Sequence, residues 1–236
     1  EGSSIFEYYM REYAGVDPAD GAPMWYQYVN TNNGDVIQTM TPYLNENPDA
    51  VVERRITKTY SEATDKFVGK SAIPDLRGAF RINARYKNFM LSTQFTYQIG
   101  GYGYDSQYSE LMTDRFGAAG NNFHTDIRNR WRQPGDITSV PRLADALDAN
   151  ASSLSTRFLT KTDFFAFNNF MIGYDFPKDL INSVGVSNLN VYLTGDNLFM
   201  SSVREGFLPN TSQSGLSGRG FYAPLTTFTL GVNCKF

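Results

Sequence analysis

Residues 224–236, Pro-Leu-Thr-Thr-Phe-Thr-Leu-Gly-Val-Asn-Cys-Lys-Phe, decide the fold of this chain. Apolar side chains recur at every second position, through Phe228, Leu230 and Val232 to Phe236, and mostly polar side chains lie between them. This period of two predicts a β-strand with one apolar and one polar face. Its length of roughly 11–13 residues suits a strand that crosses a bilayer at a tilt of about 45°. The alternative is an edge strand of a soluble sandwich, although soluble strands usually have about 5–6 residues.

The same alternation recurs upstream and predicts five long strands in all. They are expected at about 77–86, 89–99, 162–176, 189–199 and 225–236. In the first of them, Arg81, Asn83 and Arg85 share one face. Arginine that faces lipid at mid-depth costs about 2–4 kcal/mol, so these three side chains are predicted to face a wet lumen. In the third strand, the phenylalanines within 164–167 would crowd both faces, which predicts either a β-bulge or an interior aromatic cluster.

The connections between these strands differ in length. Two are short, at 87–88 and about 177–188, and two are long, at about 100–157 and 200–223. Outer-membrane barrels have short periplasmic turns and longer extracellular loops. Short and long connections alternate along the chain, as they do in such a barrel. The long segments are therefore predicted to be extracellular loops. Residues 106–116 carry apolar side chains at helical spacing and predict a short helix within the first long loop.

The rest of the barrel is expected to lie outside this chain. Residues 1–76 are predicted to form an extracellular loop region with a strand near its start, and 77–236 to form the last five barrel strands and their loops. About eight strands are needed to close even a small barrel, and an open sheet edge is not tolerated in hydrocarbon. The chain is therefore expected to be the C-terminal part of a larger polypeptide.

Composition excludes several classes of protein. Lys and Arg number 21 against 24 Asp and Glu, so the basic footprint of a nucleic-acid-binding protein is missing. One Cys and one His argue against a closed zinc site and against Cys–His catalysis. The scattered carboxylates Asp17, Asp20 and Asp35 fit no EF-hand spacing. We therefore predict no catalytic residues, no metal site, no cofactor and no nucleic-acid partner.

Several short strings, taken in order and with their spacing, resemble the SusC-like (SusC/RagA family) TonB-dependent outer-membrane transporters of Bacteroidetes. The strings are Gly2-Ser3-Ser4-Ile5-Phe6-Glu7, Ala14-Gly15-Val16-Asp17-Pro18, Pro23-Met24-Trp25-Tyr26, Val68-Gly69-Lys70-Ser71-Ala72-Ile73-Pro74-Asp75, Phe95-Thr96-Tyr97-Gln98-Ile99-Gly100-Gly101-Tyr102, His124-Thr125-Asp126, Asn129-Arg130-Trp131, Pro134-Gly135-Asp136, Pro141-Arg142-Leu143, Gly195-Asp196-Asn197-Leu198-Phe199 and Thr227-Phe228-Thr229-Leu230-Gly231. The resemblance covers essentially the whole chain.

The resemblance implies an all-β protein, namely the C-terminal strands of a transmembrane antiparallel β-barrel with long extracellular loops, of the 22-stranded, plugged kind. It implies import of nutrient oligomers, glycans or peptides, with a SusD-like surface lipoprotein as lid and TonB-ExbB-ExbD as the energy source. The remaining barrel, the plug and outer-membrane lipid are the other implied partners, and the bacterial outer membrane is the implied location. The plug and the TonB-contacting segment are missing from this sequence, so no coupling residue is assigned. Phe236 fits the family's terminal signal for barrel assembly.

Three aromatic residues in the outer loops are candidates for substrate binding. Tyr102 and Tyr104 follow the Gly100-Gly101 pair at the outer end of the second strand, and Trp131 lies between two arginines. Stacking on a sugar or a peptide is the functional interpretation. The structural interpretation is a tight turn with an interfacial aromatic belt for the tyrosines and a loop anchor for the tryptophan.

Two other classes of function remain as alternatives. A soluble all-β carbohydrate-binding or adhesin module would bury Leu230 and its alternates between two sheets. A β-rich hydrolase would need an acid and a base that converge in one pocket, and nothing in the sequence brings such a pair together.

Overall fold

The computed structural model describes residues 4–113, 122–144, 148–209 and 223–236. It divides into two compact units, which are described separately. We call the first unit, made of residues 4–72 and 102–160 within those ranges, the loop body. The second unit contains one five-stranded sheet, which we call the long sheet, and comprises the described residues of 73–101 and 161–236.

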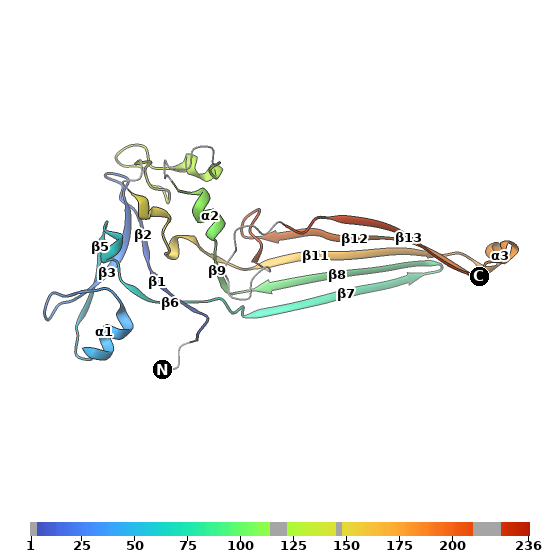
Figure 1. Cartoon of the computed structure of the whole chain (residues 1–236), viewed down its shortest axis with the longest axis horizontal. Helices are drawn as coiled ribbons and strands as arrows, with labels where there is room; N and C mark the ends of the chain where they lie inside the picture. Colours follow the sequence, from blue (N-terminus) through green and yellow to red (C-terminus); the bar gives the residue numbers. More distant parts are fainter. Residues whose placement is uncertain (1–3, 114–121, 145–147, 210–222) are drawn as a thin grey trace. The chain divides into compact units, whose positions relative to one another are not determined.

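Two antiparallel sheets dominate the N-terminal part of the loop body (Figure 1). In one, β1 (Glu7–Arg11) pairs with β6 (Asp65–Ser71). In the other, β3 (Pro23–Asn30) pairs with three strands: β2 (Tyr13–Val16), β4 (Val36–Ile37) and β5 (Val52–Thr57). The region expected to be extracellular loop therefore contains an ordered β-structure as well as the strand expected near its start.

Short helices and one small strand pair complete the loop body. The α-helices are α1 (Met40–Glu46) and α2 (Ser106–Leu111), and β9 (Tyr102–Tyr104) pairs with β10 (Leu159–Lys161). Single 3-10 turns occur at Tyr60–Glu62, Thr125–Asn129, Ala149–Ser152 and Thr156–Phe158. The helix predicted over 106–116 begins where expected, after Asp105, whose carboxylate accepts a hydrogen bond from the Tyr108 amide. It ends at Leu111, and residues 114–121 of the predicted loop lie outside the described residues.

The loop body has a buried core of its own. Trp25, on the central strand β3, is 2% exposed, and Phe158 is also 2% exposed. The Trp25 ring meets the rings of Tyr13 and Tyr60 edge to face, with centroids 6.2 and 5.4 Å away. Such aromatic pairs add to the stabilisation from burial, so the loop body is folded structure rather than a set of free loops.

The long sheet is antiparallel throughout, in the order β13-β12-β11-β8-β7 (Figure 1). Its strands are β7 (Leu76–Tyr86), β8 (Phe89–Ile99), β11 (Phe164–Asp175), β12 (Asn188–Ser202) and β13 (Thr227–Lys235). The ends of these strands lie within three residues of the predicted ones. The strands are long because each sequence keeps its alternation over most of its length.

One face of the long sheet is apolar and exposed. Phe228, Leu230 and Val232 of β13 have exposed fractions of 63%, 71% and 60%, and Phe80 and Ile82 of β7 have 44% and 51%. Direct register places Leu230 opposite Leu193 and Phe80 opposite Phe95. Soluble monomers seldom expose large contiguous apolar patches, so this face requires an apolar environment.

A β-bulge keeps Phe167 and Phe170 of β11 on that apolar face. The register shifts between Phe167 and Asn169 toward both neighbouring strands. The extra residue lets Phe167 and Phe170 project to the same side, although they are three positions apart. The ring of Phe167 stacks on that of Phe95 at 4.7 Å, and Phe95 stacks on Phe80 at 4.9 Å. Of the two predicted explanations for the phenylalanine run, the bulge is confirmed.

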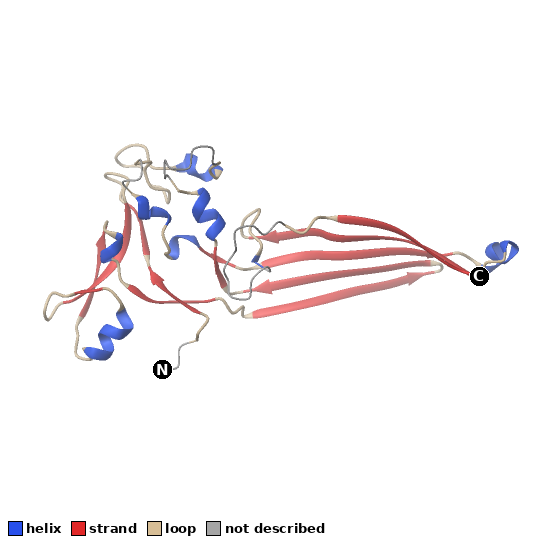
Figure 2. Ribbon diagram, in the orientation of Figure 1, coloured by secondary structure: helices blue, strands red, loops and turns tan. Residues whose placement is uncertain are grey.

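The two ends of the long sheet carry connections of different kinds. At one end, β7 and β8 are joined by the two-residue turn 87–88, where Lys87 has φ 52°, as primed hairpin turns require. The same end carries the connection from β11 to β12, with α3 (Lys178–Ile181) and the 3-10 turn Asn182–Val184 (Figure 2). At the other end the chain leaves β8 for β9 and leaves β12 toward β13. Residues 210–222 of that last predicted loop lie outside the described residues.

Candidate functional site

The polar face of the long sheet brings together the predicted lumen-facing residues Arg81, Asn83 and Arg85. Arg81 Nη2 donates to Gln94 Oε1 at 2.6 Å, and Asn83 Oδ1 accepts a hydrogen bond from Ser92 Oγ at 2.8 Å. Each of these partners lies on the neighbouring strand β8. The three side chains share a face because they alternate with Ile82 and Ala84 along β7.

Arg85 connects three strands through one carboxylate. It forms an ion pair with Asp175 of β11, and the second oxygen of Asp175 accepts from Asn190 Nδ2 of β12 at 2.7 Å. The Arg85 side chain is 63% exposed, so water screens the pair and its net contribution to stability is small. The arrangement is a polar ladder across the sheet, and its exposure to a lumen stays a prediction.

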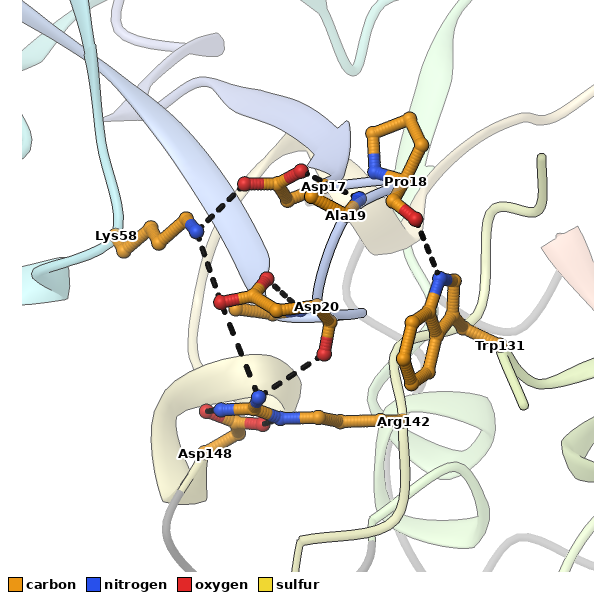
Figure 3. Close-up of polar contacts among 9 residues, drawn as sticks. Asp17, Pro18, Ala19, Asp20, Lys58, Trp131, Arg142 and Asp148 are labelled. Carbon is orange, nitrogen blue, oxygen red and sulfur yellow. Dashed lines mark hydrogen bonds and ion pairs between the residues drawn. The ribbon is translucent and has the colours of Figure 1, made fainter. Parts of the chain in front are cut away.

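Trp131 anchors a surface loop to the loop body (Figure 3). Its indole Nε1 donates to the Pro18 carbonyl at 3.0 Å, and its backbone amide donates to the Val140 carbonyl at 3.0 Å. A Cβ added to Gly21 would lie 2.4 Å from the indole ring, so the ring rests directly on the Gly21 backbone. These contacts describe the loop anchor of the structural interpretation, and a contact between Trp131 and substrate stays a prediction.

An ion-pair network lies beside that anchor (Figure 3). Lys58 Nζ is 2.5 Å from Asp17 Oδ2 and 2.9 Å from Asp20 Oδ2. Arg142 donates to the Asp20 carbonyl through Nη1 and to Asp148 Oδ2 through Nε, both at 2.9 Å. The network connects the turn at residues 17–22 to Lys58, which directly follows β5, and to the segment that follows Trp131.

The charges in this network shift one another's pKa values. The hydrogen bond from Lys58 is the main cause that lowers the pKa of Asp17. For Asp20 the main cause is the hydrogen bond from the Ala22 amide, followed by that from Lys58. The two carboxylates in turn raise the pKa of Lys58. All three groups are therefore held in their charged forms at neutral pH.

Tyr102 and Tyr104 occupy different environments although they are two residues apart. Tyr102 is half-buried, its hydroxyl accepts from Lys70 Nζ at 3.0 Å, and the same ammonium lies 4.5 Å from the ring centroid. Tyr104 is 7% exposed and packs in a cluster with Met112, Val140 and Phe158. The structure thus gives Tyr104 a packing role, and substrate contacts of either ring stay predictions.

The sequence did not reveal which side chains join Trp131. In the sequence Asp17 and Asp20 stand among scattered loop carboxylates, and nothing marks Lys58 as their partner. Asp20 and Lys58 are 38 positions apart in the sequence, and no local signal indicates their pairing. Asp17 and Arg142 each belong to a string that carries the family resemblance, but neither string indicates the pairing with Lys58.

The structure supports a structural role for His124 and Asp126. His124 Nδ1 accepts from the Asp126 amide at 3.2 Å, and Asp126 Oδ2 accepts from the Tyr108 hydroxyl at 2.7 Å. These bonds cap a 3-10 turn and fix it to α2. Within the described ranges, no three His, Cys, Asp or Glu side chains are grouped so that they could hold a metal ion. Among the same residues, no helix is long and apolar enough to cross a membrane.

The chain is similar in sequence to bacterial TonB-dependent receptors. It is 25% identical to TonB-dependent receptor P3 of Formosa agariphila over 246 residues, which covers 100% of this chain and 22% of the receptor. It is 26% identical to TonB-dependent receptor P39 of the same organism over 180 residues, covering 74% of this chain and 17% of that protein. No protein-family model matches the chain.

Solved structures show the same fold. The RagAB peptide importer in its "open-open" state matches 98% of this chain with a TM-score of 0.72 and 23% identity. Its "closed-closed" state matches 96% with a TM-score of 0.69 and 22% identity. In both cases the match covers 22% of the importer chain. The all-β barrel fold class is thereby confirmed.

The resemblance to SusC-like TonB-dependent transporters is confirmed by these similarities. The relatives named here are receptors and transporters rather than enzymes, in agreement with the expected transport class. The chain spans about a fifth of the length of the curated relatives that it matches.

Proposed function

We propose, from the similarity of the whole chain to TonB-dependent receptors, that it forms part of an outer-membrane importer for nutrient oligomers. The single observation that carries this proposal is the exposed apolar face of the long sheet. A strand pattern that turns Phe228, Leu230 and Val232 outward is stable in lipid, where apolar side chains need no further cover and the backbone groups pair between strands.

The opposite face supports the same function. Arg81, Asn83 and Arg85 pair with polar side chains of the next strand instead of being buried. Strands of an outer-membrane barrel have this pattern, with apolar side chains toward lipid and polar side chains toward a water-filled lumen. The soluble adhesin or carbohydrate-binding module would instead seal Leu230 in a core, and Leu230 is 71% exposed.

The connections indicate which end faces the cell exterior. The tight turn 87–88 and the α3 connection lie at one end of the long sheet, and the long connections, which contain the chain of the loop body, join the strands at their other ends. By the length rule for outer-membrane barrels, the turn end is periplasmic and the loop body is extracellular. Substrate, glycan or peptide, would then meet the loop body first.

The partners follow from the same assignment. A SusD-like surface lipoprotein would cover the extracellular side, as the similarity to the RagAB peptide importer suggests. The rest of the barrel and plug would close the lumen, and TonB-ExbB-ExbD would act through a segment of the longer protein. Phe236, which is 87% exposed beyond β13, is proposed as the assembly terminus.

Spin labels at alternate positions of β13 test the proposal. In the complete protein with Cys234 replaced by serine, single cysteines are introduced at Leu230 and at Thr229 and labelled with a nitroxide. We expect oxygen, which concentrates in lipid, to relax the label at 230, and a water-soluble nickel chelate to relax the label at 229. Val232 and Asn233 form a second matched pair. Equal response to both relaxants at 230 and 229 would exclude a lipid-facing strand.

A further inference from the structure

Strand β5 (Val52–Thr57) forms an open edge of the sheet built around β3 in the loop body. It pairs with β3 along all six of its residues, and no other strand of the described residues pairs with it. The four consecutive side chains from Glu53 to Ile56 are exposed. An unpaired strand edge is a template for another extended chain, so a further strand can be added to the sheet at β5.

The hydrogen-bond pattern shows which backbone groups of β5 point outward. The Thr31 amide donates to the Val51 carbonyl at 2.8 Å, one step beyond the paired residues of β3 and β5. Bonded and non-bonded pairs alternate in an antiparallel ladder, so residues 51, 53, 55 and 57 bond to β3. The N–H and C=O groups of Val52, Arg54 and Ile56 therefore point away from β3. Within the described ranges these groups have no hydrogen-bond partner.

Arg54 supplies a cation beside this edge. Its guanidinium lies 4.5 Å from the centroid of the Tyr26 ring on β3, and in the described part of the chain no carboxylate pairs with it. Arg55, which projects from the other face of the strand, is already paired with Glu53 at 2.7 Å. Stacking on the ring orders the Arg54 guanidinium and leaves its N–H groups available to a carboxylate. Ordering a group in advance lowers the cost of binding.

The charge at Arg54 indicates what kind of strand fits this edge. If two copies of β5 paired through all three outward positions, Arg54 would lie directly opposite its own copy, and like charges in that position are destabilising. A strand with a carboxylate there would instead form an ion pair. Apolar residues two positions to either side of it would meet Val52 and Ile56, and Ile56 is 56% exposed.

We propose that the outer edge of β5 binds an extended peptide by strand addition, with an acidic residue of the peptide opposite Arg54 and apolar residues opposite Val52 and Ile56. The backbone repeat of a peptide matches the spacing of the outward N–H and C=O groups. A glycan has no such alternation of amide donors and carbonyl acceptors. The inference rests on the proposed function, since it takes the imported oligomer to be a peptide that meets the loop body first.

The first experiment compares two peptides that differ in one charge. Thr-Val-Thr-Glu-Thr-Val-Thr-amide and its lysine counterpart carry the same fluorophore at the N-terminus. Each is titrated with the complete detergent-solubilised protein, and binding is followed by fluorescence anisotropy. We expect the glutamate probe to bind roughly 2- to 30-fold more tightly, the difference between an opposite-charge and a like-charge cross-strand pair. Equal affinities, or a preference for the lysine probe, would overturn the proposal.

The charge of the chain makes this comparison stringent. The chain has a net charge of −3, so non-specific attraction to it favours the lysine probe rather than the glutamate probe. A preference for glutamate therefore requires a local cation.

Backbone methylation tests the strand pairing itself. The probe residues opposite Val52, Arg54 and Ile56 turn their N–H groups toward β5, and the threonines between them turn theirs away. N-methylation at the glutamate removes a donor and separates the strands, so the affinity should fall by about tenfold or more. N-methylation at the next threonine is the matched control and should leave most of the affinity. Equal losses at the two positions would contradict strand addition.

Charge exchange in the protein locates the site. Arg54→Glu should reverse the preference, so that the lysine probe binds more tightly than the glutamate probe, and Arg54→Gln should remove the preference. Arg55→Glu makes the same change of charge on the other face of the strand and should keep the original preference. A preference that survives in both Arg54 variants would exclude this edge as the binding site.

Competition distinguishes the other occupants of the edge. Maltotetraose should not displace the glutamate probe, and displacement would assign the edge to a glycan. Assembly with the SusD-like lipoprotein should leave the probe bound, and its complete loss on assembly would assign the edge to the lipoprotein. A transporter dimer that the probe dissociates would assign the edge to a second copy. Failure of the peptide inference is distinguishable from failure of the proposed function, because the alternating spin-label response of β13 does not depend on β5.

Discussion

The long sheet and the loop body bury their apolar side chains in opposite ways. In the loop body, Trp25, Ile37 and Phe158 are at most 2% exposed and are covered by the chain itself. In the long sheet, Leu230 and Val232 are 71% and 60% exposed, and the other face carries polar side chains such as Arg81 and Gln94. One chain therefore contains parts suited to two solvents, and the part suited to lipid is recognised by apolar side chains that the protein leaves uncovered.

The two units also differ in how they use glycine beside an aromatic ring. In the long sheet, a Cβ on Gly231 would lie 2.2 Å from the Tyr192 ring, because that ring covers the neighbouring strand. In the loop body, Gly21 supports Trp131 in the same manner but also has φ +75°. The sheet uses glycine for close packing across a regular ladder, whereas the loop body uses it for a turn as well.

The largest expected effect is the loss of the loop-body core. Phe158→Ala removes a ring that is 2% exposed and should lower the free energy of unfolding of the loop body by about 3–5 kcal/mol. Hydrogen exchange of the complete protein measures it, amide by amide. Phe123→Ala, at a ring that is 48% exposed, is the control and should cost less than about 0.5 kcal/mol. Equal effects would show that the core is not closed.

The next effect tests the lipid-facing strand. Leu230→Arg places a charge on the apolar face and should cost up to about 2–4 kcal/mol, the value for the middle of a bilayer. The fraction of folded protein in the outer membrane, measured by its heat-dependent gel migration, should fall. Thr229→Arg, one residue away on the polar face, should assemble normally. Loss of assembly in the Thr229 variant alone would reverse the assignment of the two faces.

A smaller effect concerns the Trp131 anchor. Gly21→Ala combines strain at φ +75° with a clash against the indole and should destabilise the loop by about 1–3 kcal/mol. Gly34→Ala has a similar φ of +81° with no atom within 4 Å, so it isolates the backbone strain. Proteolytic nicking near residues 131–142 should increase more in the Gly21 variant, and equal nicking would mean that the ring contact is unimportant.

The smallest effect is the dependence of loop-body stability on pH. The folded-state pKa values of Asp17 and Asp20 are lowered below 3.8, so both carboxylates stabilise the folded form above that pH. The contribution is lost as the pH falls from about 3.8 through the lowered values. Lys58→Met removes the main cause at Asp17 and should flatten the acid dependence of stability below about pH 3.8, as measured by hydrogen exchange. An unchanged slope would exclude the Lys58 pairs as its source.

Prediction from sequence succeeded where the signal is local. The alternation in β7 and β8 and the turn at 87–88 depend on neighbouring residues, so their ends were predictable. The phenylalanine run in β11 signalled an irregularity, and the register showed which one. The β-structure of the loop body could not be predicted in this way. Its strands β3 and β5 do not alternate cleanly, and they pair across more than twenty residues of intervening chain.

The candidate binding residues divide in the same way. Tyr102, Tyr104 and Trp131 could be named from residue type, yet nothing local indicated that Tyr104 would lie in a core. The burial of the Tyr13 hydroxyl also depends on distant segments, since the Tyr13 ring contacts Trp25 and lies 5.5 Å from the Arg157 guanidinium. Long-range burial is not encoded in any short window of sequence.

The sequence by itself determined that alternating strands would present one apolar and one polar face, because side-chain direction in a strand follows position parity. It also determined that Arg81 and Arg85 would stay off the apolar face. Only the tertiary structure decided that the N-terminal segments fold into a body with its own core. The tertiary structure also decided that Lys58 pairs with Asp17 and Asp20, and that the Tyr13 hydroxyl is buried. These features depend on contacts between distant segments, and such contacts form only when the whole chain is packed.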